Sequence, residues 1–477
     1  MRRALLVFSL ASMTAMTASH AADSTQLTIY RSDAGSLYSS TDHGASDAGR
    51  ATIHEQREVK LSDGLQTIHF DGLPSSLDTE ALAVFFPDHA ASVAARRLLL
   101  PGQSGLLAAH EGSLVKVLGD SGNVLAQGTL RGSRDGLLVE ANGSLTLVKN
   151  YAAVQLADAN IRSGAQLELA VQAQRAGSHL ARLDYATGGL GWRAAYSATL
   201  HDGATCRMDF TSLASIANRS GRDWHTERLT LVAGEPHFDN VSAPQPMMSR
   251  ARGGVMAMAA APPAQAEFGD YRSYTLDGVV ELPDDSVTQV PLYPARSIDC
   301  QRSWLYESGN AWSPQQPMLE RDYLPRSRGI SSRLGFKAFD SLPAGYLRVA
   351  SVINGQHELL GEARINDTAK DRAVEVELGT PFDLHADRER TAFQLDRATH
   401  TLNEAFRITL SNTSAVARTI TVREHPPRWR EWTLASSSQK PASQSVDTLD
   451  FAVVVPANGK TTLDYALRYH WTAQDEN

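Results

Sequence analysis

Residues 192–236 read WRAAYSATLHDGATCRMDFTSLASIANRSGRDWHTERLTLVAGEP, and this stretch decides the fold. Every second residue from 206 to 210 is apolar, and the same period of two returns at Leu229 and Leu231. This period is typical of strands with one buried face. Residues 218–221, Asn-Arg-Ser-Gly, favour a turn between the two segments. The stretch therefore predicts three short strands joined by tight turns.

Two tryptophans lie within this stretch, one at its start and one near its end. Trp192 and Trp224 are large apolar side chains that each carry a single hydrogen-bond donor. We expect both to anchor the core of a sandwich rather than to stack on a ligand. The alternation slips after Phe210, which predicts a β-bulge in the second strand.

Alternating apolar and polar residues recur along most of the chain. The last segment, residues 463–471, keeps a strict period of two, which is typical of an antiparallel sheet with one wet face. No long amphipathic helix is evident in the pattern. The sequence therefore predicts an all-β fold of successive antiparallel β-sandwich domains of the immunoglobulin-like type.

The N-terminal half contains a segment of different character. Residues 101–160 hold four or five short alternating runs, and Asn142-Gly143 between two of them is a strong hairpin signal. Strands this close together predict a small β-barrel inserted in this half. The expected organisation is a signal peptide at 1–21, an N-terminal β domain at 22–100, the barrel at 101–160, and C-terminal β-sandwiches at 161–477 with a flexible insertion at 241–270.

The first residues carry the pattern of a secretory signal peptide. Arg2 and Arg3 precede an apolar run at residues 4–18, and Ser19-His20-Ala21 fits a small-x-small cleavage site. We expect cleavage near Ala21 and a periplasmic or secreted mature protein. No other stretch is long enough for a transmembrane helix. The formal net charge of −8 argues against nucleic acid or anionic lipid as a partner.

The chain has two cysteines, Cys206 and Cys300, which meet an oxidising compartment after export. The two cysteines could form a disulfide, or they could both be free and buried. Sequence alone does not decide between these alternatives, because it does not set their separation in space.

A short internal echo links two distant strand ends. Asn218-Arg219-Ser220 and Asn412-Thr413-Ser414 each combine N-x-S with the start of a turn. Two sandwiches of similar construction would explain the echo, and chance would explain it too.

One set of residues in the stretch 192–236 forms an ordered motif: Trp192, Tyr196, Asn218, Ser220, Gly221, Asp223, Trp224, Leu229, Leu231, Gly234 and Pro236. The order of these residues resembles that of a bacterial family of exported proteins named after mucoidy inhibitor A, whose C-terminal region is a domain of unknown function. Further segments that resemble the same domain follow at 342–345, 359–365 and 378–383. The resemblance implies fold and export, and no activity. The chain departs from the family in one respect, since the expected barrel takes the place of a long coiled coil.

Motifs for catalysis or metal binding give little support to an active site. The sequence has no metalloprotease, phosphate-loop, dinucleotide-binding or nucleophile-elbow motif. Ser437 and Lys440 match S-x-x-K by spacing, but in a polar loop rather than on a helix. Glu424-His425 offers a pair of ligands and His400 lies nearby in sequence, yet a lone strand histidine is far more often packed or solvated. We therefore predict no catalytic, cofactor-binding or metal site.

An acidic group and a methionine group are two further candidate sites. Glu362, Asp367 and Asp383 would make an acidic patch, although solvated strand ends explain them equally well. The insertion contains a methionine cluster whose thioethers suit Cu(I), but its irregular spacing without His or Cys favours a disordered loop. The cluster consists of Met247, Met248, Met256 and Met258.

The sequence is thus best explained as a non-catalytic exported envelope protein that presents β-sandwich surfaces to another protein or a glycan. The second hypothesis is a hydrolase of cell-envelope polymers, with a carboxylate or histidine–metal site assembled across strands. A third is copper or redox handling by the methionine-rich insertion.

Overall fold

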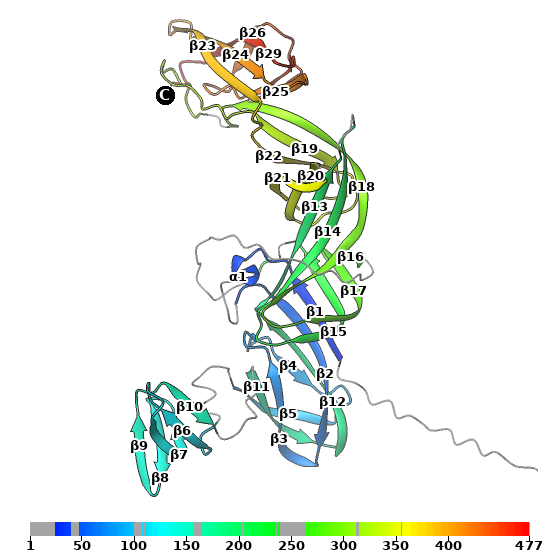
Figure 1. Ribbon diagram of the computed structural model, residues 1–477, viewed down its shortest axis with the longest axis vertical. Helices are drawn as coiled ribbons and strands as arrows, with labels where there is room; N and C mark the ends of the chain where they lie inside the picture. The colour runs from blue at the N-terminus through cyan, green and yellow to red at the C-terminus, as the bar shows by residue number, and fades with distance from the viewer. Residues whose placement is uncertain are drawn as a thin grey trace, which may run out of the picture.

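The structure is a computed structural model, and it describes residues 24–39, 47–99, 107, 110–156, 165–201, 205–234, 236–238, 263–311, 314–353 and 355–476. The expected leader and the methionine cluster lie outside these residues. Strands make up nearly all the regular structure of the described part, and its one labelled helix, α1 (Gly35–Tyr38), is a single turn. The all-β prediction is confirmed. Figure 1 shows the sheets following one another along the long axis of the molecule.

A first sandwich is built from three sheets. Its seven-stranded sheet has the order β16 (Ala264–Phe268), β17 (Tyr271–Leu282), β15 (Trp224–Ala233), β1 (Ser24–Tyr30), β2 (Ala51–Leu61), β12 (Gly177–Thr187) and β4 (Ala83–Phe85). Its three-stranded sheet has the order β3 (Gly64–Leu73), β11 (Ala165–Ala173) and β5 (Ala91–Leu99). The third sheet starts with β21 (Gln356–Ile365), β20 (Gly345–Ile353), β13 (Leu190–Leu200), β14 (Arg207–Asn218) and β18 (Ser286–Ser308).

A second sandwich shares β18 with the first. Beyond β18 the ten-stranded sheet continues through β25 (Arg418–Glu424), β28 (Leu449–Val455) and β27 (Ser443–Gln444), while β19 (Ser331–Lys337) and β22 (Ala373–Gly379) pair alongside. The opposite sheet has the order β23 (Leu384–Asp396), β24 (Thr401–Asn412), β29 (Gly459–His470) and β26 (Trp432–Ser437). The 23-residue strand β18 is therefore the continuous link between the two sandwiches (Figure 1).

The two sandwiches share a central pattern of strand pairing. In the first, β14 pairs with β13 and β18, β15 pairs with β17, and β1 lies parallel to β15 and antiparallel to β2. In the second, β24 pairs with β23 and β29, β25 pairs with β28, and the end of β18 lies parallel to β25 and antiparallel to β19. Parallel pairs thus occur among the antiparallel ones that the sequence led us to expect.

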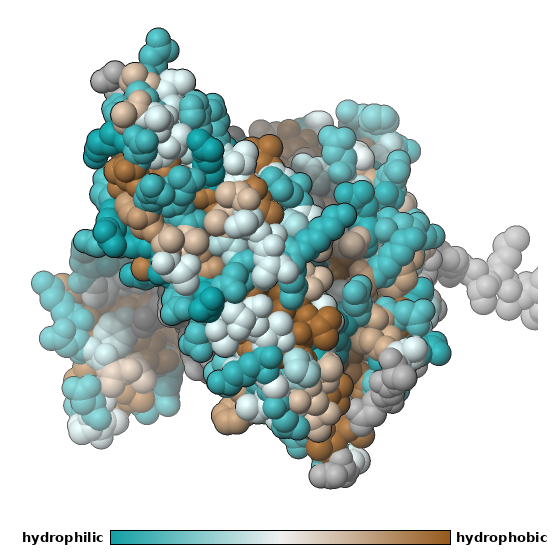
Figure 2. Space-filling view, turned by 90° about the horizontal axis from the view of Figure 1, so that it is seen from above, coloured by the Kyte–Doolittle hydropathy of each residue, from teal (hydrophilic) through white to brown (hydrophobic). Residues whose placement is uncertain are grey.

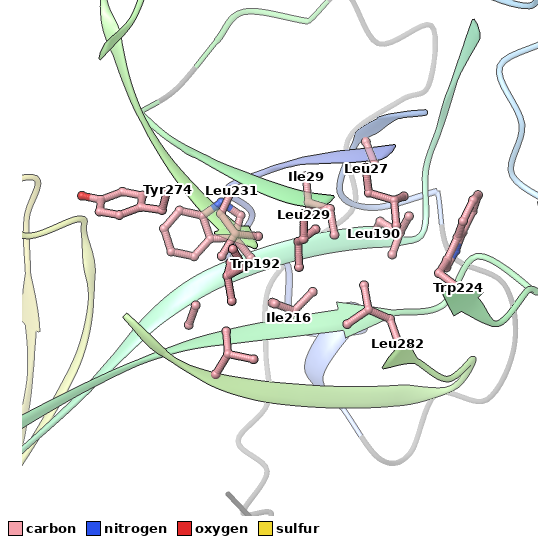
Figure 3. Packing of buried hydrophobic residues seen from close by; sticks show 14 of the residues in the cluster. Leu27, Ile29, Leu190, Trp192, Ile216, Trp224, Leu229, Leu231, Tyr274 and Leu282 are labelled. Atoms are coloured by element: carbon pink, nitrogen blue, oxygen red, sulfur yellow. The ribbon is translucent and has the colours of Figure 1, made fainter. Parts of the chain in front are cut away.

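The tryptophans expected in a sandwich core lie in one. Trp192 and Trp224 are buried, and Trp192 meets the ring of Tyr274 edge-on at 6.0 Å between centroids (Figure 3). Leu229 and Leu231 pack in the same cluster. The second sandwich has a separate core that includes Trp429 and Trp471.

The inserted segment corrects one expectation. Its strands β10 (Ala153–Leu156), β6 (Leu114–Leu118), β7 (Val124–Gly132), β8 (Leu137–Ala141) and β9 (Ser144–Val148) form an open sheet in this order, not a closed barrel. Closure would need β10 to pair with β9, but β10 pairs only with β6 and β9 only with β8 among the described strands. After this sheet the chain returns to the first sandwich, where β11 pairs with β3 and β5.

Cys206 and Cys300 form a disulfide with 5.0 Å between their Cα atoms. Cys206 directly precedes β14, and Cys300 lies in β18 where that strand leaves the first sandwich for the second. The bond therefore ties β14 to β18 at the junction of the two units.

Candidate functional site

The turn between β14 and β15 is closed by side-chain hydrogen bonds. The Asn218 amide nitrogen donates to the carbonyls of Arg222 and Leu282, both at 2.8 Å. The Asn218 amide oxygen accepts from the backbone NH and the hydroxyl of Ser220 at 3.1 and 2.7 Å. The Trp224 indole donates to the same hydroxyl at 2.9 Å. The buried Asn218 side chain thus has partners for all of its polar groups.

Other motif residues fix the ends of strands. The Asp223 carboxylate accepts from the Asp284 backbone NH at 2.7 Å, which ties the turn to the end of β17. Gly234 has a φ of +106°, and a Cβ there would meet the Tyr271 ring at 2.5 Å. Only glycine fits this position without displacing the ring. Pro236 follows in a described stretch without regular structure.

The remaining motif side chains hold distant segments together. The Trp192 indole donates to the Val232 carbonyl at 2.9 Å, and the Tyr196 hydroxyl donates to the Pro343 carbonyl at 2.7 Å. The motif therefore builds turns and core contacts, and these contacts leave its polar groups committed to the fold.

The second sandwich uses the same turn. The Asn412 amide donates to the carbonyls of Val416 and Pro456 at 2.9 and 3.1 Å. Its amide oxygen accepts from the backbone NH and hydroxyl of Ser414 at 3.0 and 2.7 Å. This arrangement matches that of Asn218, and with the shared pattern of strand pairing it explains the N-x-S echo by a repeated unit.

A polar cleft of about 420 Å³ lies beside the first turn. The buried Glu55 carboxylate receives two hydrogen bonds from Arg57 at 3.0 and 2.6 Å, and Arg222 lies 2.7 Å from its other oxygen. Arg222 also stacks over the Trp224 ring at 4.4 Å. Both oxygens of the Glu55 carboxylate are therefore occupied by arginine side chains.

A larger groove of about 640 Å³ crosses the outer face of β22, β19, β18, β25 and β28. We call it the bridging groove, because these strands span both sandwiches. Strand pairing aligns Gly335 with Gln301, Leu305 with Thr421, and Thr421 with Ala452. Small side chains thus form much of the floor.

Charged side chains of both signs border the bridging groove. The Arg333 guanidinium donates to Glu375 at 3.0 Å on one side. On the other side Arg423 donates two hydrogen bonds to Asp450 at 2.9 and 2.8 Å, and these bonds hold the pKa of the Asp450 carboxyl below its usual value. The groove therefore presents fixed ion pairs at these two borders.

Aromatic rings contribute little to the open surface of this groove. The Phe336 ring packs in the core of the first sandwich, and the Trp304 ring packs against the core of the second. Both residues line the groove, yet each lies on the inward-facing side of its strand.

The candidate catalytic residues Ser437, Glu424 and His425 make hydrogen bonds or ion pairs with other residues. Ser437 donates to the Gln439 carbonyl at 2.6 Å, within the polar segment that holds Lys440. The buried Glu424 carboxylate is paired with Arg388 at 3.1 Å. His425 lies 2.9 Å from Glu307.

The remaining candidates, one histidine and three carboxylates, each contact a different partner. His400 packs edge-on against the Trp471 ring at 6.2 Å between centroids. Each of the three carboxylates has its own partner: Glu362 pairs with Arg348, Asp367 accepts from the Ala344 NH, and Asp383 accepts from Thr413. Within the described ranges no group of three or more His, Cys, Asp or Glu side chains is arranged to hold a metal ion.

Sequence reasoning missed the residues that border the bridging groove. The alternation in β19 and β25 places Arg333 and Arg423 on an outward face, and this signal was available. The alternation does not say that β19 and β25 flank the same stretch of β18, which only the pairing of both strands with β18 shows.

Fold and surfaces together define an all-β protein of two linked, repeated sandwiches with an inserted five-stranded sheet. Residues 181–473 match the model of a domain of unknown function, DUF4139, and the chain belongs to that family. No curated protein matches the chain.

Proposed function

We propose that this is a non-catalytic, exported envelope protein whose sandwich surfaces hold a protein or glycan partner. The bridging groove is the observation that carries the proposal. It is an open surface of small side chains with paired charges at its borders, and it lies on the strand that joins both sandwiches.

Export rests on the sequence of the first residues and on the cysteine pair. Arg2 and Arg3, the apolar run and Ser19-His20-Ala21 support secretion with cleavage near Ala21. A disulfide persists in oxidising compartments such as the periplasm. The resemblance to mucoidy inhibitor A agrees with this location. None of the helices in the described ranges has the length and apolarity to span a membrane.

The groove favours an extended polypeptide as its occupant. The Trp304 and Phe336 rings point into the cores, so neither offers an open face on which an uncharged sugar ring could stack. Fixed charges of both signs suit a polar segment with complementary charges, because electrostatic complementarity sets register and specificity. Hydrophilic and hydrophobic residues are interspersed on the face seen in Figure 2.

The test uses a photo-cross-linking amino acid at Ser303, on the groove floor, in the full-length protein in its native host. We expect discrete protein adducts at this position. Gly335→Gln should remove them, because a Cβ at Gly335 meets only ordinary contacts at 3.8 Å while the longer side chain fills the floor. The matched control is Gly132→Gln in β7, where a Cβ also meets only one contact at 3.8 Å.

Equal adducts in wild type and Gly335→Gln, with both variants folded, would contradict binding in this groove. Adducts that contain carbohydrate would replace the protein partner with a glycan. Fractionation gives a separate check on export, since the mature chain should begin close to Ala22 outside the cytoplasm.

The hydrolase alternative gains no support from the geometry. Three carboxylates line the groove: Glu375 and Asp450 are each paired with an arginine, and Asp299 lies 3.5 Å from Arg207. The hydrogen bonds from Arg423 also hold the pKa of the Asp450 carboxyl below its usual value, which disfavours a role as general acid.

A further inference from the structure

A second groove lies on the second sandwich, at the start of β26 and the end of β29 and beside the segment that follows β27. Its volume is about 610 Å³. We call it the flank groove, and it is separate from the bridging groove. The residues used below are Arg430, Glu431, Thr433, Gln444, Arg468 and His470.

Arg468 is the uncommitted cation of the flank groove. Strand pairing places it between two uncharged polar residues, Asn403 on β24 and Thr433 on β26. Among the described residues no carboxylate lies within ion-pair distance of its guanidinium. Arg430, which also lines the groove, differs from Arg468 because it pairs with Asp475.

A second paired arginine, Arg407, lies on the same outward face of the sheet as Arg468. Arg407 donates to Asp464 at 2.8 Å, four residues before Arg468 along β29. The same outward face therefore carries one paired and one unpaired arginine, and this pair provides a matched comparison.

Neutral groups around Arg468 suit hydroxyl groups better than further charge. Asn403, Thr433 and Gln444 offer amide and hydroxyl donors and acceptors. In the next row along the sheet Ala405 lies opposite Ala466, so the surface there is low enough for a ring to approach. A guanidinium binds carboxylate through two parallel hydrogen bonds, which gives both strength and orientation.

A peptide strand fits this place less well. Strand β26 has an irregular register against β29 between Leu434 and Ser436, and such bulges turn an edge away from further pairing. The Trp432 indole also donates to the Val446 carbonyl at 2.8 Å, which holds the segment after β27 against the start of β26. The edge is thus partly covered.

We propose that the flank groove binds an acidic glycan, with a uronate-type carboxylate on the Arg468 guanidinium and sugar hydroxyls on the neighbouring amides and hydroxyls. His470 and Glu431, 3.9 Å apart, border the far side of the site. The protein would then join a polypeptide at one groove to an acidic polysaccharide at the other. The glycan site does not depend on the bridging groove, and each is tested by its own variant.

The test is calorimetric titration of the full-length mature protein with two carboxylated polysaccharides, polygalacturonate and hyaluronan. We expect at least one to bind, with affinity that falls as salt rises, and its methyl-esterified form to bind at least tenfold more weakly. Arg468→Gln should weaken binding at least tenfold, and Arg468→Lys should restore part of it. Arg407→Gln is the control and should bind as wild type does.

Several results would overturn the proposal. These are no binding of either polysaccharide, equal losses in Arg468→Gln and Arg407→Gln, and binding of polyglutamate or poly(glycerol phosphate) as tight as that of the uronate. Arg468 is exposed, so unchanged melting temperatures in both variants show that a loss of binding is not a loss of fold. Gly335→Gln should leave glycan binding unchanged, which separates this site from the bridging groove.

Discussion

Replacing Asn218 by alanine removes four hydrogen bonds from the turn between β14 and β15. Two of them satisfy the carbonyls of Arg222 and Leu282, and two engage Ser220. A net hydrogen bond contributes about 1 kcal/mol, and a buried carbonyl left without a partner costs about 1–3 kcal/mol. Because the site is fully buried, water replaces few of these bonds. We expect a loss of about 3 kcal/mol in the first sandwich.

Native-state hydrogen exchange followed by mass spectrometry measures this loss locally, since a chain with two sandwiches need not unfold in one step. Amides of β14 and β15 should exchange about 100-fold faster in Asn218→Ala, while those of β24 and β25 stay as in wild type. Asn412→Ala should give the converse result. A change below about fivefold, or a change spread equally over both sandwiches, would refute the reasoning from the repeated turn.

Three further outcomes follow from buried pairs. Replacing Cys206 and Cys300 by serine should cost about 2–4 kcal/mol, read from guanidinium unfolding midpoints, and reduction of the wild type should reproduce the loss. The hydrogen bonds from Arg423 lower the pKa of Asp450 in the folded protein. The resulting stabilisation is therefore present above the unfolded pKa of about 3.9 and is lost as the pH falls below it. Asp450→Asn should thus make the free energy of unfolding less dependent on pH in the acid range. The buried Glu404 on β24 pairs with Arg390 at 3.3 Å and with Arg428 at 2.7 Å. Glu404→Gln should lower the melting temperature by removing about 3–5 kcal/mol, because both arginines lose their counter-charge; an unchanged melt would show that the pairs are not needed.

The sequence anticipated the class of fold and many of its strands. Alternation is a local property, so Leu229 and Leu231 or the run at residues 463–471 reveal a strand without knowledge of its neighbours. The size and apolar character of Trp192 and Trp224 predicted their place in a core, which the structure confirms. The prediction of a barrel was wrong because closure depends on which edge strands pair. The hairpin signal at Asn142-Gly143 fixes only the pairing of β8 with β9.

The candidate surfaces were beyond sequence reasoning for a related reason. Arg333, Asp450 and Gly335 come together because β19, β18, β25 and β28 lie side by side, in an order set by packing over the whole domain. Likewise the unpaired state of Arg468 depends on its neighbours in β24 and β26.

The amino-acid sequence by itself determined that this chain folds as pleated strands joined by turns. Short-range periodicity and turn chemistry carry that information from one residue to the next. Only the tertiary structure decided that β18 passes from one sandwich into the other, that Cys206 meets Cys300 at that passage, and that two grooves form on the outer faces. Those features depend on strand register between segments far apart in the chain, which no local pattern encodes.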